Sequence, residues 1–248
     1  MNSIKLLFLK IRLKYFSRFA GKYDFNKILK ASGIDVGDHT IFYDPNSMSI
    51  DRQRPWMLHI GDYCKITKGT VILTHDYSRS VLRRKYGDII GEAGETYIGD
   101  NVFIGMNSII LMGTHIGDNV IIGAGSVVSG TFPDNCVIAG NPARMIRSLD
   151  DHYLIRKEKS LVEAKQYFIS FLTHYKRNPS IKEMGPFFPL FLERSEESLL
   201  REGIDTDLNG DDSREIIDAF LKSKPIFDSY ESFIRFAEGN DECHNKYC

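Results

Sequence analysis

Aliphatic residues recur at every sixth position over a long stretch in the middle of the chain. These positions hold only isoleucine and valine: Ile98, Ile104, Ile110, Ile116, Ile122 and Val128. A half-buried strand alternates every two residues and an amphipathic helix repeats every 3.6, so a period of six fits neither. The period is typical of a β-solenoid, in which each six-residue unit forms one side of a coil and its first residue points into the core.

The pentapeptide Ile-Gly-Asp-Asn-Val occurs at 98–102 and again at 116–120, which is 18 residues later. Three units of six make one triangular coil, so the two copies are predicted to stack directly. Stacking buries a continuous column of isoleucine that no single unit could bury alone. Weaker units begin at Ile60 and Val36. We therefore expect the solenoid to occupy residues 34–147.

Composition places the chain among soluble globular proteins. Its 248 residues are 42% hydrophobic and 26% charged,. A net charge of −1 provides no general attraction to nucleic acid, so no nucleic-acid partner is expected,. Four cysteines are too few for a disulfide scaffold,. There is neither a long apolar run nor a clear signal peptide, which favours a cytoplasmic protein.

The N-terminal segment, residues 1–33, is predicted to be a basic amphipathic helix. Residues 1–30 contain eight basic residues and one acidic residue. Apolar residues follow at helical spacing: Ile4, Leu7, Phe8, Ile11, Tyr15 and Phe19,. One interpretation is a cap over the open end of the solenoid. The other is peripheral contact with an anionic membrane through residues 1–30, which would place the protein at the inner face of the membrane.

Two regions do not follow the repeat. Residues 76–97 interrupt it, and an insertion within a coil must loop outward, so we expect a mobile arm or lid there. Residues 148–248 are expected to form a mostly helical C-terminal extension, whose role the sequence does not indicate. Helices are predicted at 151–175, 213–222 and 229–238, with an extended segment at 185–189.

His75 is the residue that most clearly suggests chemistry. It lies where the first run of repeats ends and the excursion begins. Near neutral pH an imidazole can accept a proton from a hydroxyl group, which makes His75 a candidate general base. We expect Asp76 or a nearby backbone carbonyl to hold the second ring nitrogen.

The repeats, the Thr74-His75-Asp76 excursion and the closing segment 139–144 resemble the left-handed β-helix, hexapeptide-repeat acyltransferases. The nearest members of that family are the maltose/galactoside-type and polysaccharide O-acetyltransferases. The resemblance covers residues 34–147. It implies a left-handed parallel β-helix, a homotrimer with active sites between adjacent solenoids, acetyl-CoA as the acyl donor, and no metal.

The resemblance also implies roles for individual residues. His75 becomes the catalytic base, with Asp76 beside it. The implied coenzyme A contacts are Gly105, Met106, Ala124, Ser129, Gly130, Arg144 and Arg147. The implied acceptor contacts are Asp44, Asn46 and Trp56. Met106 departs from the family pattern because it has no hydroxyl, so an oxyanion there would need the Met106 backbone N–H or Asn107. Gly130 stands where the family often has lysine.

These features predict an acetyl-CoA-dependent O-acetyltransferase that acts on a sugar hydroxyl, in a surface polysaccharide or its precursor. Related alternatives are an N-acetyltransferase on an amino-sugar nucleotide and a serine-type acetyltransferase. Alternatives of another class are a non-catalytic solenoid scaffold and a zinc enzyme of the γ-carbonic anhydrase type. The zinc ligands would have to come from His39, His59, His75 and His115.

Overall fold

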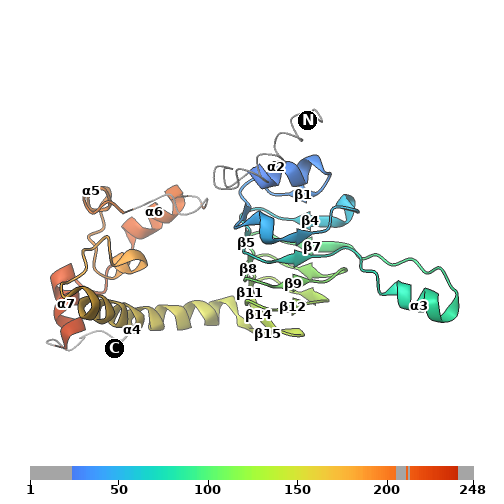
Figure 1. The fold of residues 1–248 in the computed structure, drawn as a ribbon. Coiled ribbons are helices and arrows are strands. Elements are labelled where there is room, and N and C mark those ends of the chain that lie inside the picture. The colour runs from blue at the N-terminus through green and yellow to red at the C-terminus, as the bar shows by residue number, and fades with distance from the viewer. Residues whose placement is uncertain (1–23, 205–210, 212, 240–248) are drawn as a thin grey trace. The chain divides into compact units, whose positions relative to one another are not determined.

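The computed structural model describes residues 24–204, 211 and 213–239. Most of the predicted basic helix, residues 1–23, lies outside the described residues. The chain divides into two compact units, one up to His152 and one from Tyr153 onward. Short strands build the first unit and helices build the second (Figure 1).

The first unit is a three-sided coil, and each side is one sheet (Figure 1). The five-stranded sheet contains β1 (Asp35–Val36), β4 (Leu58–Ile60), β7 (Thr96–Ile98), β10 (His115–Ile116) and β13 (Thr131–Phe132). The six-stranded sheet contains β2 (Ile41–Phe42), β5 (Lys65–Ile66), β8 (Phe103–Ile104), β11 (Ile121–Ile122), β14 (Cys136–Gly140) and β15 (Ala143–Ser148). The four-stranded sheet contains β3 (Ser49–Ile50), β6 (Val71–Ile72), β9 (Ile109–Ile110) and β12 (Val127–Val128).

Strand register confirms the predicted 18-residue coil. Ile98 pairs with Ile116 in the five-stranded sheet, in parallel. Ile104 pairs with Ile122 in the six-stranded sheet, and Ile110 pairs with Val128 in the four-stranded sheet. Each hexapeptide therefore lies directly against the corresponding hexapeptide of the next coil. The expected β-helix is confirmed.

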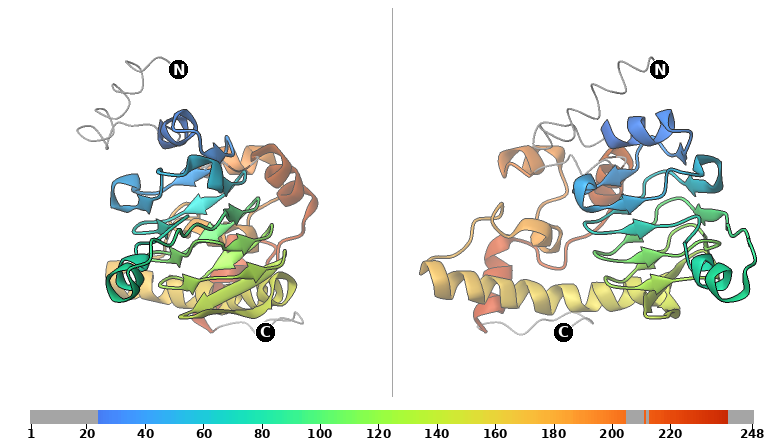
Figure 2. Two further views of the ribbon diagram at one scale, coloured as in Figure 1. Left: turned by 90° about the vertical axis from the view of Figure 1, so that its right-hand side faces the viewer. Right: turned by 45° about the vertical axis from the view of Figure 1, so that its right-hand side comes forward.

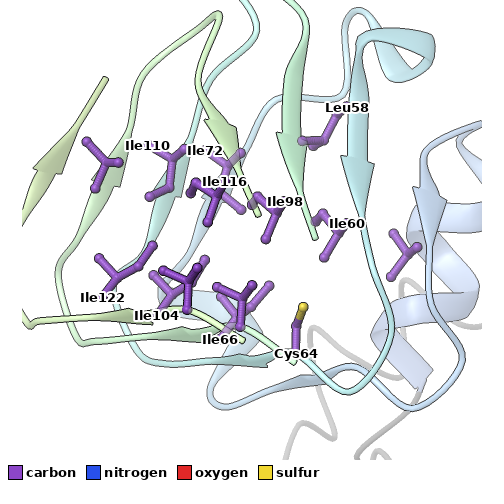
Figure 3. Close-up of a cluster of buried hydrophobic side chains, with 14 of the residues drawn as sticks. Leu58, Ile60, Cys64, Ile66, Ile72, Ile98, Ile104, Ile110, Ile116 and Ile122 are labelled. Atoms are coloured by element: carbon purple, nitrogen blue, oxygen red, sulfur yellow. The ribbon is translucent and has the colours of Figure 1, made fainter. Parts of the chain in front are cut away.

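The first residues of the hexapeptides form the core of the solenoid (Figure 3). Ile66, Ile72, Ile98, Ile104, Ile110, Ile116 and Ile122 are all fully buried. A buried isoleucine contributes on the order of 2 kcal/mol through removal of apolar surface from water. Cys64, the fifth residue of the unit that begins at Ile60, is also buried, and burial raises the pKa of its thiol to about 11. The thiol is therefore a neutral core group at physiological pH.

The chain turns at three corners in each coil. The first corner joins the six-stranded to the four-stranded sheet, the second joins the four-stranded to the five-stranded sheet, and the third joins the five-stranded to the six-stranded sheet. At the third corner, Asp118 Oδ1 accepts the backbone N–H of Asp100 at 2.8 Å, and Asp134 Oδ1 accepts that of Asp118 at 2.9 Å. Asn119 follows with a φ of 57°, a left-handed conformation that asparagine adopts more readily than most residues,. The repeated Gly-Asp-Asn therefore forms a turn that is hydrogen-bonded to the equivalent turn of the neighbouring coil.

Helix α2 (Asp24–Ala31) covers the first coil. Its Leu29 is fully buried, and Phe25 packs edge-on against Phe42 with ring centroids 5.0 Å apart. The buried Asn26 side chain donates to the carbonyls of Gly37 at 3.0 Å and Thr40 at 2.7 Å. These bonds satisfy backbone groups that the first coil exposes at its open end.

An arm leaves the coil between β6 and β7. It carries helix α3 (Arg79–Tyr86), which has no buried residue and lies at the far end of the arm (Figures 1 and 2). The arm ends slightly earlier than the expected boundary at residue 97. Thr96 and Tyr97 already belong to β7, because the Tyr97 N–H donates to the Thr114 carbonyl of the next coil at 2.9 Å.

The second unit is helical and has its own core. Its described elements are α4 (Leu149–Tyr175), η3 (Gly185–Leu190), α5 (Glu196–Arg201), α6 (Ser213–Lys222) and α7 (Tyr230–Glu238). Its buried residues include Leu161, Ala164, Phe168, Met184, Phe191, Phe227, Phe233 and Ala237. The expectation of an extended segment at 185–189 was wrong. Pro186 instead opens a 3-10 helix, because its fixed φ suits the first helical turn,.

Within the described parts of the chain, no helix combines the length and apolar composition needed to cross a bilayer.

The close stacking of coils gives a direct test at Gly99. A Cβ added there would lie 2.7 Å from the backbone of Gly117 in the next coil, whereas one added at Gly91 in the arm would meet nothing within 4 Å. We expect Gly99→Ala to lower the free energy of unfolding by about 2 kcal/mol through overpacking. Gly91→Ala should leave it nearly unchanged. Chemical denaturation of both variants measures this, and equal effects would contradict the stacking.

Candidate active site

His75 lies at the root of the arm, at the second corner of the coil. The backbone fixes this position on both sides of the excursion. The Gly94 N–H donates to the Thr74 carbonyl at 3.0 Å, and the Thr96 hydroxyl donates to the Leu73 carbonyl at 2.7 Å. The departing and returning chains are therefore bonded to each other beside the imidazole.

The His75 ring is held by a carboxylate from the preceding coil. Asp51 follows β3, and its Oδ2 lies 2.5 Å from His75 Nδ1. The Thr74 backbone N–H donates to the same oxygen at 3.2 Å, and the Thr74 hydroxyl also donates to it. The Gln53 N–H donates to the other oxygen at 2.9 Å. The Asp51 side chain is 5% exposed and that of His75 is 17% exposed, so the pair is shielded while the ring still reaches solvent.

These contacts decide where the imidazole carries its proton. Burial is the largest influence on Asp51 and opposes ionisation. Hydrogen bonds from the Thr74 hydroxyl, the Gln53 backbone, the His75 ring and the Thr74 backbone outweigh it and lower the Asp51 pKa below 3.8,. An ionised carboxylate can only accept, so His75 Nδ1 must be the donor. The neutral ring then has its free lone pair on Nε2, as a general base requires.

The partner of His75 differs from the expected one. Asp76 Oδ1 accepts the backbone N–H of Ser78 at 2.8 Å and shapes the start of the arm. Successive side chains of an extended segment point to opposite sides, which directs Asp76 away from its neighbour. Asp51 comes from the preceding coil. Because Ile50 pairs with Ile72, Asp51 stands beside the segment that carries His75.

Asp51 was not predicted as the partner of His75, because the repeat spacing is irregular at this coil. The offset between β3 and β6 is 22 residues instead of 18. The extra residues accommodate η2 (Pro55–Met57), a short 3-10 turn inserted at the second corner. Asp51 precedes His75 by 24 residues, two more than this lengthened offset, because it stands beside Leu73 and reaches forward to the ring.

Apart from Arg144 and Arg147, the other predicted site residues fall at two different corners of one chain. The first corner carries Asp44, Asn46, Gly105, Met106 and Ala124. The second corner carries Trp56, Ser129 and Gly130 together with His75. The four-stranded sheet separates these corners. A single chain therefore does not bring the predicted coenzyme contacts of the first corner to the imidazole.

The first corner presents small residues and backbone at the surface. Ala124 is exposed, and Met106 is 56% exposed. The Gly105 N–H is already bonded to the Ile122 carbonyl at 2.9 Å, and the Met106 carbonyl accepts the Gly125 N–H at 2.8 Å. Gly105 is buried, and a Cβ there would lie 2.8 Å from the Ala124 Cα. Its role is thus to let adjacent coils approach.

Arg144 and Arg147 lie on β15, the antiparallel edge strand that closes the six-stranded sheet. Arg144 is exposed and its guanidinium donates to the Ala143 carbonyl at 2.8 Å. Arg147 is half-buried beside Val137.

The predicted acceptor residues are exposed. Trp56 stands on η2 with 68% of its surface exposed, close in sequence to Arg54, whose guanidinium donates to the Glu92 carbonyl of the arm at 2.9 Å. Asp44 adopts a left-handed φ of 60° and pairs with Lys68 at 3.7 Å. Asn46 is on the exposed η1 turn (Pro45–Ser47). Only Trp56 shares a corner with His75.

The remaining candidate histidines have other partners. His39 Nδ1 lies 2.8 Å from Asp62, and its ring stacks on Tyr63. His59 Nε2 lies 3.0 Å from Glu95. The His115 ring stacks on Tyr97 with centroids 4.8 Å apart. Of these four side chains, His75 alone stands at the second corner.

Comparison with known proteins agrees with this architecture. The hexapeptide repeat of succinyl-transferase matches residues 96–129. Protein CapG of Staphylococcus aureus is 42% identical over 151 residues, which cover 59% of this chain and 80% of CapG.

Two solved structures illustrate the similarity. A hexapeptide-repeat acetyltransferase of Vibrio cholerae O1 biovar eltor, complexed with acetyl coenzyme A, is 32% identical, with 47% of this chain and 60% of that chain covered and a TM-score of 0.40. A maltose O-acetyltransferase of Clostridium difficile 630 is 26% identical, with 60% of this chain and 89% of that chain covered and a TM-score of 0.43. On the repeat and the extent of the match with CapG, the chain belongs to the left-handed β-helix, hexapeptide-repeat acyltransferase family.

Proposed function

We propose that this protein is an acetyl-CoA-dependent O-acetyltransferase and that its acceptor is a sugar hydroxyl, in a surface polysaccharide or its precursor. The contact that carries the proposal is the one between Asp51 and His75 Nδ1, because it leaves Nε2 free to accept a proton,. His39 also contacts a carboxylate, that of Asp62, but its side chain is 53% exposed and it stands at the third corner. The Asp51–His75 pair is instead shielded at the root of the arm. The exposed Trp56 at the same corner offers an aromatic face to a sugar ring,.

The proposed reaction is a direct acyl transfer. His75 Nε2 takes the proton of the acceptor hydroxyl while the hydroxyl oxygen attacks the thioester carbonyl carbon. A C–O bond forms, the C–S bond breaks, and the proton on Nε2 passes to the departing sulfur. Asp51 stabilises the imidazolium that exists between these two proton transfers. The tetrahedral oxyanion needs a preorganised donor, for which we propose the Met106 backbone N–H with Asn107 as the alternative.

The acyl donor is proposed to lie along the first corner of a neighbouring copy. Ala124 and Gly125 present little side-chain bulk there, so a pantetheine arm could reach backbone groups. Ser129 and Gly130 would flank the reacting end, and Arg144 and Arg147 would bind the phosphates of the coenzyme.

We propose a homotrimer because the two corners are separated within one chain and must be brought together by another copy. On three of the four strands of the four-stranded sheet, the outward residue is apolar and only partly buried within one chain: Val71, Ile109 and Val127. The fourth strand has Ser49 there. Phe103 on the six-stranded sheet is 41% exposed. Apolar surface of this kind favours contact with another copy. A cyclic trimer would set the first corner of one copy against the second corner of the next.

The first prediction concerns the imidazole and its carboxylate. His75→Ala should lower kcat about a thousandfold, the range of a lost general base. Asp51→Asn should lower kcat at least about a hundredfold without raising the KM for acetyl-CoA, because it no longer fixes the tautomer. Asp76→Asn is the matched control, since Asp76 does not contact the ring, and should stay near wild type. Thiol release with a panel of glycan acceptors measures all three.

Two outcomes would contradict that assignment. One is a full rate in His75→Ala, which would indicate a scaffold or a different base. The other is acetyl transfer to serine without any glycan, which would favour a serine-type enzyme.

The second prediction tests whether copies share a site. His75→Ala removes the base, and Ala124→Trp fills the proposed donor groove on an exposed position. Each variant alone should be inactive. Oligomers assembled from a mixture of both should regain part of the activity, because some sites combine an intact base with an intact groove. Activity that stays absent in mixed oligomers would contradict a site shared between copies.

A further inference from the structure

Helix α3 has an apolar face that nothing in the described chain covers. Val81 is 66% exposed, Leu82 is 41% exposed and Tyr86 is 61% exposed. At 100° per residue these three side chains fall on one side of the helix. A helix of a folded domain normally buries such a face, and α3 buries no residue at all.

The apolar surface continues past the end of the helix. Gly87 ends α3 in a left-handed conformation with a φ of 80°. Ile89, which follows it, is 90% exposed, and Ile90 is 46% exposed. A Cβ added at Gly87 or Gly91 would meet nothing within 4 Å. The tip of the arm is therefore apolar and free of packing against its own chain.

Cations lie among and beside these apolar side chains. At 100° per residue, Lys85 falls between Val81 and Leu82,. Its Nζ lies 5.0 Å from the centre of the Tyr86 ring. Arg79, Arg83, Arg84 and Lys85 all lie on α3, and the helix contains no carboxylate. The Arg79 and Arg83 guanidinium groups lie 5.1 Å and 5.8 Å from the centre of the Tyr77 ring. Asp88 is the one acidic residue between 79 and 91. The tip therefore carries a net positive charge beside its isoleucines.

We propose that this arm surface, formed by the α3 cations and by Val81, Leu82, Tyr86, Ile89 and Ile90, docks on a bilayer of anionic phospholipid. Short amphipathic helices bind such surfaces by placing apolar side chains among the headgroups and cations against the phosphates. A soluble anion would engage the cations and leave five apolar side chains in water. Another protein copy could cover the isoleucines but would have to match the positive charges of Arg83, Arg84 and Lys85 as well.

The proposal does not depend on acetyl transfer. It concerns residues at the far end of the arm, whereas the arm root at Thr74 is bonded to the returning chain. Docking at the tip would hold the second corner facing the membrane, whatever reaction takes place there.

Vesicle co-sedimentation of the full-length protein tests the proposal. The probes are vesicles of phosphatidylcholine alone and of phosphatidylcholine mixed with phosphatidylglycerol. We expect binding to the anionic vesicles only, and added salt should weaken it. Arg83→Gln combined with Arg84→Gln should reduce the partition coefficient roughly 20-fold. Ile89→Ser combined with Ile90→Ser should reduce it at least about tenfold.

Matched controls separate the arm from general charge and hydrophobicity. Lys157→Gln with Lys159→Gln removes two exposed cations from α4, and Leu200→Ser removes an apolar side chain that is 81% exposed on α5. Both should bind vesicles like the wild type. Unchanged binding in the two arm variants would overturn the proposal. Wild-type vesicle binding with an altered oligomeric mass in the arm variants would overturn it too, and would assign the patch to a neighbouring copy.

Discussion

The backbone ladder between successive coils is the constraint on which the rest of this protein depends. Each short strand is bonded to the strand of the next coil in fixed parallel register, so the neighbour of every residue is set by its place in the repeat. Side chains at equivalent positions stack, which turns one isoleucine in six into a core and one aspartate in eighteen into a hydrogen-bonded corner. The same register brings Asp51 beneath His75. The catalytic geometry we propose is thus a product of the solenoid and needs no separate scaffold.

The candidate catalytic residues lie where insertions interrupt the repeat. The short η2 turn and the long arm both leave the coil at the second corner. They interrupt the regular stacking there and place Asp51, Thr74 and His75 next to one another. Asp51 remains ionised in this setting because Thr74 and Gln53 donate to it, in spite of its burial. An exposed aspartate would be screened by water and would orient the imidazole less firmly.

Sequence periodicity predicted what depends on repetition. The column from Ile98 to Ile122 and the 18-residue register were both predicted and are confirmed. Asp51 was missed because η2 lengthens its coil, so the simple repeat gives the wrong offset. The helix within the arm was not predicted, because eight residues are too few to show a helical pattern of apolar positions. In the second unit, Pro186 was interpreted as extended because proline allows both conformations, and only the packing of Phe191 and its neighbours decides between them.

The measurement that tests the central claim most directly is the protonation of His75 itself. Nitrogen NMR of the histidine-labelled protein, with His75 assigned by its loss in a His75→Gln variant, distinguishes the two ring nitrogens at neutral pH. The account predicts a proton on Nδ1, facing Asp51, and a bare Nε2. A proton on Nε2 with a bare Nδ1, or a ring protonated on both nitrogens at neutral pH, would contradict it.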